Sequence, residues 1–217
     1  MTPLRVVAHL ASPAILREPP VLDGLLLAGE AARIAAERPL SVEEADALPL
    51  PLARVETEHG WWWAASQVHL SGSEALAHAS RRPGVELHER LTSGRSLNVV
   101  SGPDKMLRSP LYYRTGMLRL EWTCIGDATG VARALSRVCG VGHRRTHGWG
   151  WVRRWVVSQD PSGPALADYG TDLAIRHLPV EAVTGLPAGR VMRRRLPLTP
   201  PYWQAARSVD CWQAGAV

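Results

Sequence analysis

The order of apolar patterns along the chain is the feature that most limits how it can fold. Leu4 to Leu10 alternates between apolar and other positions, as a half-buried strand does. Asp23 is placed to cap a helix that runs to about Glu37. The aromatic-rich run Trp61 to Leu70 predicts a second strand. The beginning of the chain therefore indicates a strand–helix–strand unit.

The same order returns further along the chain. Gly116 to Cys124 predicts a strand, and Asp127 is placed to cap a helix that Gly140 ends. The apolar positions of this helix share one face, and Trp151 to Ser158 predicts the next strand. Two such units in series predict an α+β protein with the split βαβ arrangement, which is ferredoxin-like (RRM-like).

The rest of the chain divides into an insertion and a tail. Segment 71–115 is too long for a hairpin loop, so we expect an insertion with a role of its own. Capping-box pairs predict short helices after Ser41, with Glu44, and after Ser71, with Glu74. The Pro- and Gly-rich tail 159–217 is expected to be an irregular extension packed on a domain formed by residues 1–158.

Basic residues gather in the second half of the chain. Residues 1–100 hold nine arginines and twelve acidic residues, a net charge of −3. Residues 101–217 hold sixteen basic and eight acidic residues, a net charge of +8. Within 105–154, ten basic residues accompany two acidic ones. This distribution is typical of a protein that binds a polyanion such as nucleic acid.

Several classes of protein are disfavoured. No run approaches the roughly 18 apolar residues of a membrane span, and no basic stretch precedes an apolar run as in a signal peptide, so we expect a cytoplasmic protein without a membrane partner. Three cysteines are too few for a disulfide framework. Cys124 and Cys139 are expected to be buried, and their spacing from His143 and His147 is not that of a zinc module. We therefore expect no metal and no cofactor.

The loop from Gly140 to Gly150 is the most informative motif. Its four glycines let the backbone turn sharply and approach a ligand closely, its amides can face phosphate oxygens, and its arginines add paired donors. The loop follows a helix rather than opening one, so it is not the dinucleotide-binding fingerprint. It also lacks the Gly-Lys-Ser/Thr ending of a P-loop. The alternative is a solvated basic turn. We predict RNA binding by Gly140, Gly142, His143, Arg144, Arg145, Thr146, His147, Gly148 and Gly150.

A second stretch, 97–114, mixes cations with tyrosine rings. Lys105, Arg108 and Arg114 stand near Tyr112 and Tyr113, and such interleaving suits single-stranded RNA. We predict that the three cations bind RNA. The alternative is an insertion whose tyrosines pack against the domain while its charges face water.

Two other functions stay open at this point. A metal-independent ribonuclease needs a general base, a general acid and cations around the phosphorane. His9, His143, His147, Tyr112, Tyr113 and Lys105 could supply these groups, but no two have a spacing that predicts their meeting. The chain could also be a structural assembly protein whose basic face meets an acidic partner.

Four stretches resemble the RAMP superfamily of CRISPR-associated proteins. They are the opening Leu4–Pro13, the Leu-Asp-Gly-Leu at 22–25, the glycine-rich loop at 140–150 and the Pro-Pro-Tyr-Trp at 200–203. Within that superfamily the chain most resembles the small subunit that caps the 5′ end of the guide RNA in type IV effector complexes. The resemblance covers most of the chain.

The resemblance implies a ferredoxin-like RNA-binding domain with a thumb-like insertion at 71–115. It implies a non-catalytic cap on the 5′ handle of CRISPR RNA, beside a neighbouring RAMP backbone subunit and a large subunit, and it leaves contact with target DNA open. The glycine-rich loop is the only RNA-binding motif that it carries over. In some other CRISPR types the equivalent subunit cleaves precursor RNA, so a metal-independent endoribonuclease is the alternative.

Overall fold

The fold is α+β, as expected. The computed structural model describes residues 1–16, 18–58, 60–69, 75–81, 109–160, 176–182, 191–202 and 208–214. Its elements, in chain order, are β1 (Thr2–Leu10), α1 (Leu22–Ala35), α2 (Val42–Asp46), β2 (Arg54–Thr57), β3 (Gly60–Trp63), β4 (Ala75–Arg81), β5 (Ser109–Thr115), β6 (Arg119–Gly126), α4 (Ala128–Leu135), the 3₁₀ turn η2 (Arg145–His147), β7 (Val152–Gln159), β8 (Leu178–Pro179), the 3₁₀ turn η3 (Val180–Ala182), β9 (Val191–Pro197) and β10 (Ser208–Ala214). None of the described helices has the length and apolar character needed to cross a bilayer.

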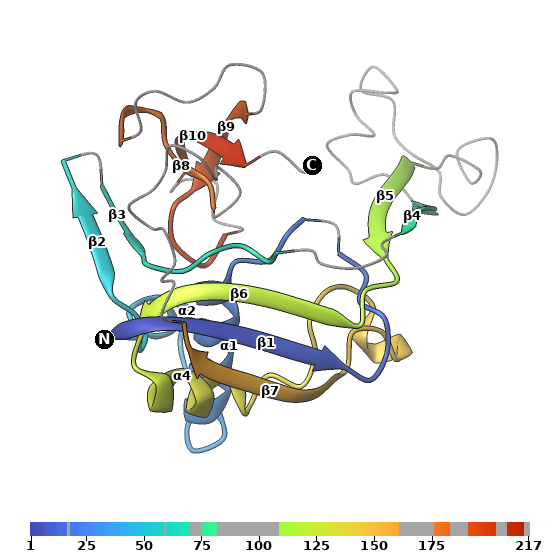
Figure 1. Cartoon of the computed structure of the whole chain (residues 1–217), viewed down its shortest axis with the longest axis horizontal. Coiled ribbons are helices and arrows are strands. Elements are labelled where there is room, and N and C mark those ends of the chain that lie inside the picture. The colour runs from blue at the N-terminus through green and yellow to red at the C-terminus, as the bar shows by residue number, and fades with distance from the viewer. Residues whose placement is uncertain are drawn as a thin grey trace.

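A three-stranded antiparallel sheet in the order β6-β1-β7 forms the centre of the molecule. Helices α1 and α4 pack together, and Figure 1 shows the helices on one side of this sheet. Alternate residues of β1, including Leu4, Val6 and Ala8, point into the core that the helices cover, where they are fully buried. The residues between them, Arg5, Val7 and His9, lie on the opposite face.

Segment 64–69 runs beside the outer edge of β6. Its amides and carbonyls bond to that strand, as in Ser66 N to Thr123 O (2.9 Å) and His69 N to Glu121 O (2.7 Å). The strand expected over Trp61–Leu70 is therefore regular only as far as Trp63, where β3 pairs with β2. The ladder breaks because Ser66 Oγ, in place of a backbone carbonyl, accepts the hydrogen bond of Thr123 N (2.9 Å).

The described parts of the tail are not irregular, which corrects the expectation for them. It contains a second antiparallel sheet in the order β8-β10-β9. A small second core joins this sheet to β3, because Trp62 packs against Leu178, Leu198 and Cys211. Apolar side chains from separate parts of the tail thus form a buried face. The sequence did not indicate this face, because the many prolines and glycines predicted an irregular segment.

Local signals placed two helix starts correctly and one wrongly. Asp127 caps α4 by accepting Gly130 N (2.8 Å), and Ser41 and Glu44 form the expected capping box on α2. Asp23 is not the N-cap, because α1 begins at Leu22; its buried carboxylate accepts from Gly24 N (2.7 Å) and Tyr202 OH (2.6 Å) and faces Arg176 Nη1 (3.4 Å). The aspartate that the sequence indicates as a helix cap instead forms a buried tertiary contact with Arg176 and Tyr202.

Part of the insertion is an antiparallel hairpin of β4 and β5, in which Tyr112 lies opposite His78 and Arg114 opposite Leu76. Figure 1 shows this hairpin beyond one end of the central sheet. β5 ends at Thr115, shortly before β6 begins at Arg119. The short helix predicted to start after Ser71 is wrong: residues 71–74 lie outside the described residues, and Ala75–Arg81, where its body would continue, form strand β4.

Candidate nucleic-acid interface

The glycine-rich loop is held at its base by backbone hydrogen bonds. Val141 N donates to Gly150 O (2.8 Å), which closes the loop upon itself. His143 N donates to Ile15 O (2.8 Å) and Gly150 N donates to Pro13 O (2.9 Å), which ties the loop to the segment after β1. The loop therefore projects from a fixed position at the end of the central sheet.

Two of its glycines are required by this closure. Gly142 has a φ of +94°, and a Cβ there would stand 2.5 Å from Ile15 O. Gly150 has a φ of +66°, and a Cβ there would collide with Val141 O. Gly148 (φ +88°) has open space around it. Gly142 and Gly150 thus shape the loop, whereas Gly148 leaves its tip accessible.

The tip of the loop is exposed and basic. His143, Arg144, Arg145, Thr146 and His147 are all exposed, and residues 145–147 form the turn η2. Arg144 adopts a left-handed conformation (φ +55°), which is uncommon for a residue with a side chain. The structure thus brings predicted residues 143–148 together on one surface, whereas Gly140 and Gly150 are buried and Gly142 is half-buried.

A second basic surface crosses the open face of the central sheet. In the strand register His9 pairs with Arg119 of β6 on one side and with Arg154 of β7 on the other. Cross-strand partners share a face, so Arg119, His9 and Arg154 form a row, which we call the basic row. A bulge between His9 and Leu10 adds exposed Arg153 to its end.

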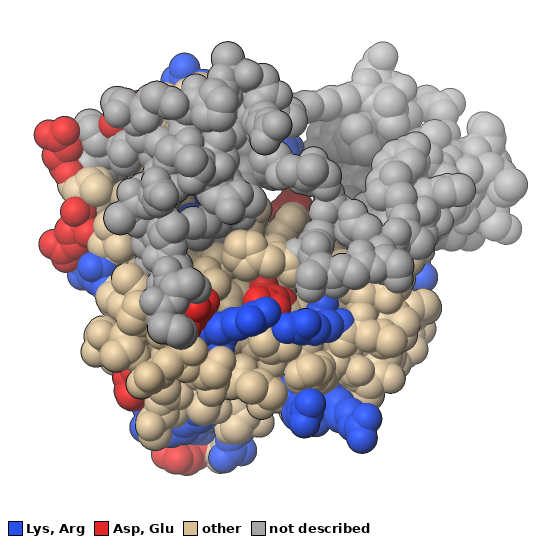
Figure 2. Space-filling model, viewed as in Figure 1, with Lys and Arg blue, Asp and Glu red and all other residues tan. Residues whose placement is uncertain are grey.

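The basic row lines a hollow of about 620 Å³ together with Leu10, Leu118 and Arg153. Figure 2 looks onto the strands of the central sheet and shows basic side chains over them, with acidic side chains between. Glu121 of β6 forms ion pairs with both Arg5 and Arg119, and its carboxylate lies 3.0 Å from Arg119 Nη2.

The charges of the basic row act on the His9 imidazole. Burial lowers the pKa of the His9 imidazole, and the positive charges of Arg154 and Arg119 lower it further. The imidazole is therefore neutral near pH 7, and the charge of the row at that pH comes from its arginines.

Unpaired arginines concentrate at this end of the molecule. Several described arginines elsewhere bond to carboxylates, as Arg38 does to Glu44 (2.9 Å) and Arg193 to Asp210 (2.6 Å). By contrast, five exposed arginines form no ion pair with any described residue: Arg137, Arg144, Arg145, Arg153 and Arg154. Their donors are free for an anion from outside.

The remaining predicted residues divide in two. Lys105 and Arg108 lie outside the described residues, and Arg114, Tyr112 and Tyr113 are placed only by the backbone register of β5. Of the possible catalytic groups, His9 stands in the basic row and His143 and His147 in the loop. The described side chains bring no two of them into hydrogen-bond contact.

The sequence missed three members of the interface. Arg119, Arg153 and Arg154 stood out only as part of a basic region, because their meeting with His9 depends on strand register. The cysteine expectation is half right: Cys124 is buried in the core, but Cys139 is exposed. Cys139 lies after the end of α4 at Leu135, not within the helix end expected for it.

No protein-family model matches the chain, and no curated protein matches it.

Proposed function

We propose that this protein binds RNA through the glycine-rich loop and the basic row. The observation that carries the proposal is the gathering of four exposed arginines without a described ion pair, Arg144, Arg145, Arg153 and Arg154, at the end of the sheet where the loop, β1 and β7 meet. Guanidinium groups bind phosphate oxygens in pairs, and a basic surface that follows an RNA backbone supplies most of its affinity. The open sheet face next to it suits bases that are not paired.

The RNA proposed is the 5′ handle of a CRISPR RNA, held without cleavage as a cap of a type IV CRISPR ribonucleoprotein. The resemblance to RAMP proteins motivates this choice, together with their ferredoxin-like fold. The sheet order β6-β1-β7 supports that fold, because segment 64–69 lies antiparallel to β6 where the remaining strand of a split βαβ sheet belongs. The partners on this proposal are a neighbouring RAMP backbone subunit and the large subunit, with contact to target DNA left to experiment.

The test is a gel-shift series with end-labelled CRISPR repeat RNA in EDTA at several salt concentrations. We expect a shift that weakens steeply with salt while the RNA stays intact. Arg153→Ala with Arg154→Ala should weaken binding, whereas Arg38→Ala with Arg193→Ala, which removes the same charge from exposed ion pairs elsewhere, should not. The absence of a shift at low salt would exclude the proposal.

One observation favours a second function, a metal-independent endoribonuclease that processes precursor CRISPR RNA. His9 is neutral near pH 7 and stands between two arginines, so it could accept the 2′-hydroxyl proton while they stabilise the phosphorane. In the gel series this function gives a discrete product ending in a 2′,3′-cyclic phosphate, and His9→Ala abolishes it. A cut that survives His9→Ala would remove this histidine from the chemistry.

A further inference from the structure

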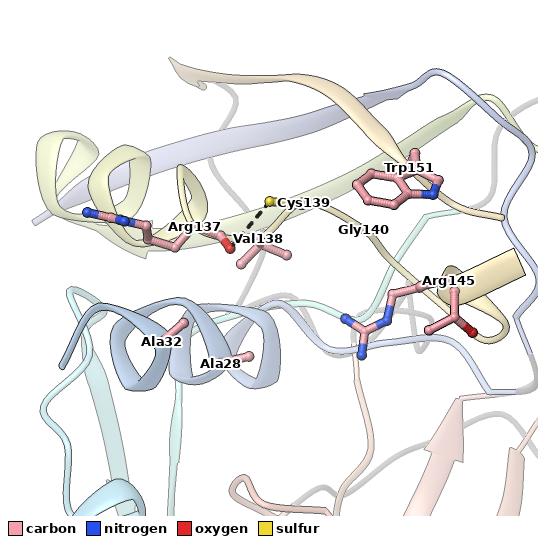
Figure 3. A pocket seen from close by; sticks show the side chains of 9 residues that line it. Ala28, Ala32, Arg137, Val138, Cys139, Gly140, Arg145 and Trp151 are labelled. Carbon is pink, nitrogen blue, oxygen red and sulfur yellow. Dashed lines mark hydrogen bonds between the residues drawn. The ribbon is translucent and has the colours of Figure 1, made fainter. Parts of the chain in front are cut away.

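A pocket of about 430 Å³ opens between α1 and the glycine-rich loop. Ala28 and Ala32, one turn apart on α1, and Val138 give it small apolar walls, and the half-exposed indole of Trp151 (48% exposed) stands over it. Figure 3 shows the Trp151 ring and the Arg145 side chain on either side of Gly140. The remaining lining residues are Arg137, Cys139, Gly140 and Thr146.

The position of Arg145 depends on Gly140. A Cβ on Gly140 would stand 3.1 Å from Arg145 Cδ, so the missing side chain leaves the space in which the Arg145 stem lies. The Arg145 guanidinium extends toward α1, while that of Arg137, at the far end, points away from the pocket (Figure 3). No acidic side chain lines the pocket, and Arg145 forms no ion pair within the described part of the chain.

We propose that this pocket binds one unstacked nucleotide, with its base against Trp151 and the alanine face of α1 and its phosphate on Arg145. Each feature matches one part of that ligand. A flat aromatic ring stacks on any base, small apolar side chains leave room for a planar group, and an unpaired guanidinium binds a phosphate in paired contacts. The volume is of the size that small ligands occupy, about 300–1,000 Å³.

The nucleotide can come from RNA or be free. RNA is the source that rests on the proposed function, since Arg145 belongs to the same glycine-rich loop. The inference adds to that function a base-binding position on the helical side of the sheet, behind the basic row. An RNA held by both surfaces would bend around the end of the sheet with one base removed from the stack.

The experiment compares wild-type protein with Trp151→Ala and Ala32→Leu, the second of which fills the pocket with a side chain that a helix accepts well. The controls are Trp151→Phe, which keeps a stacking ring, and Ala132→Leu, which places the same bulk on an exposed position of α4 outside the pocket. The ligands are repeat RNAs that each carry one abasic nucleotide, and the measurement is the dissociation constant.

We expect one abasic position to weaken wild-type binding about 5- to 100-fold. Ala32→Leu should weaken the binding of intact RNA by a similar factor. It should also remove most of the difference in affinity between intact and abasic RNA. Ala132→Leu should behave as wild type. If wild-type protein binds RNA and Ala32→Leu has the same abasic profile, the pocket proposal is wrong while the proposed function stands.

A second arm covers the free ligand. Adenosine and uridine 5′-monophosphate are titrated into ¹⁵N-labelled protein, and the indole signal of Trp151, assigned from Trp151→Phe, is followed. A second outcome is that RNA does not bind, but a monophosphate shifts this signal in wild type and not in Ala32→Leu. The pocket is then a site for a free nucleotide, and the proposed RNA-binding function is wrong while the pocket proposal stands. If neither RNA nor monophosphate depends on the pocket, the inference is overturned.

Discussion

Two groups of arginines in this molecule have opposite surroundings. Arg176 is buried between the two sheets, where Nη1 donates to Trp63 O (2.6 Å), Nη2 donates to Leu198 O (2.5 Å), and Asp23 balances the charge. Arg144, Arg145, Arg153 and Arg154 are exposed at the loop end without a described acidic partner. One group uses its donors within the fold, and the other keeps them for a ligand.

The comparison shows how the same residue type can serve stability or binding. A buried guanidinium must have its hydrogen bonds and charge satisfied, because leaving either unmet costs several kcal/mol. An exposed guanidinium in water has no such requirement, so evolution can leave it unpaired where an anion is to be bound. Variants at the two groups should therefore separate stability from affinity.

The largest effect is expected at the buried group. Asp23→Asn removes the negative charge beside Arg176 and should lower the free energy of unfolding by about 3–5 kcal/mol, measured by urea denaturation. Asp210→Asn, in an exposed pair with Arg193 (2.6 Å), should cost no more than about 1 kcal/mol. RNA affinity of the folded Asp23→Asn protein should be unchanged. A loss below 1 kcal/mol would mean that the carbonyls and Tyr202 hold Arg176 without Asp23.

The next largest effect is the pH dependence of stability caused by His177, which follows Arg176 in the chain. Burial lowers the pKa of His177 to about 4, with a further contribution from the charge of Arg176, while its hydrogen bond to Pro197 O (2.6 Å) acts in the opposite direction. Between pH 6.5 and 4, His177 is therefore protonated in the unfolded chain but stays neutral in the folded chain. The free energy of unfolding should fall across this window by about 3 kcal/mol.

The control for this pH effect is His177→Gln, whose amide can still donate to Pro197 O but does not titrate. Urea denaturation of both proteins from pH 7 to pH 4 gives the difference between their stabilities at each pH. Wild-type protein should lose stability relative to the variant as the pH falls, since only wild-type protein loses the His177 contribution. A constant difference would show that His177 titrates normally in the folded protein.

At the exposed group the effect should appear in affinity. Arg144→Ala with Arg145→Ala should weaken repeat-RNA binding about tenfold and reduce the slope of log K against log salt by about one to two contacts. Stability should change by less than about 0.5 kcal/mol, as for other exposed positions. The matched pair Arg38→Ala with Arg193→Ala controls for net charge. Unchanged affinity with an unchanged salt slope would remove the loop from the RNA interface.

The two groups also differ in what the sequence could predict. The glycine-rich loop, α4 with its Asp127 cap and the capping box at Ser41 depend on residues close together in the chain, and they were found. The contact between Asp23 and Arg176 joins residues far apart in sequence, and it looked instead like a helix cap. Local propensity cannot separate a capping aspartate from a buried one, because both stand before an apolar run.

The basic row was missed for a different reason. Each of its residues could be placed on a strand, but which residues meet depends on the register of three strands and on the bulge after His9. A shift of one residue would turn every side chain to the other face. The sequence therefore located the basic region but not the surface that its arginines form.

The smallest expected effect tests that register directly. Since Arg154 and Arg119 lower the pKa of His9, Arg154→Ala should raise it toward its ordinary value, though only in part because burial is the largest cause. The ring proton signal of His9, assigned by its loss in His9→Gln, reports this pKa in an NMR titration, and Arg38→Ala should leave it unchanged. Repeat RNA should raise the same pKa in wild-type protein, because a phosphate on the row stabilises the imidazolium and screens the arginines. An increase with Arg154→Ala but none with RNA would confirm the row and place the RNA elsewhere, which would leave the glycine-rich loop as its main contact.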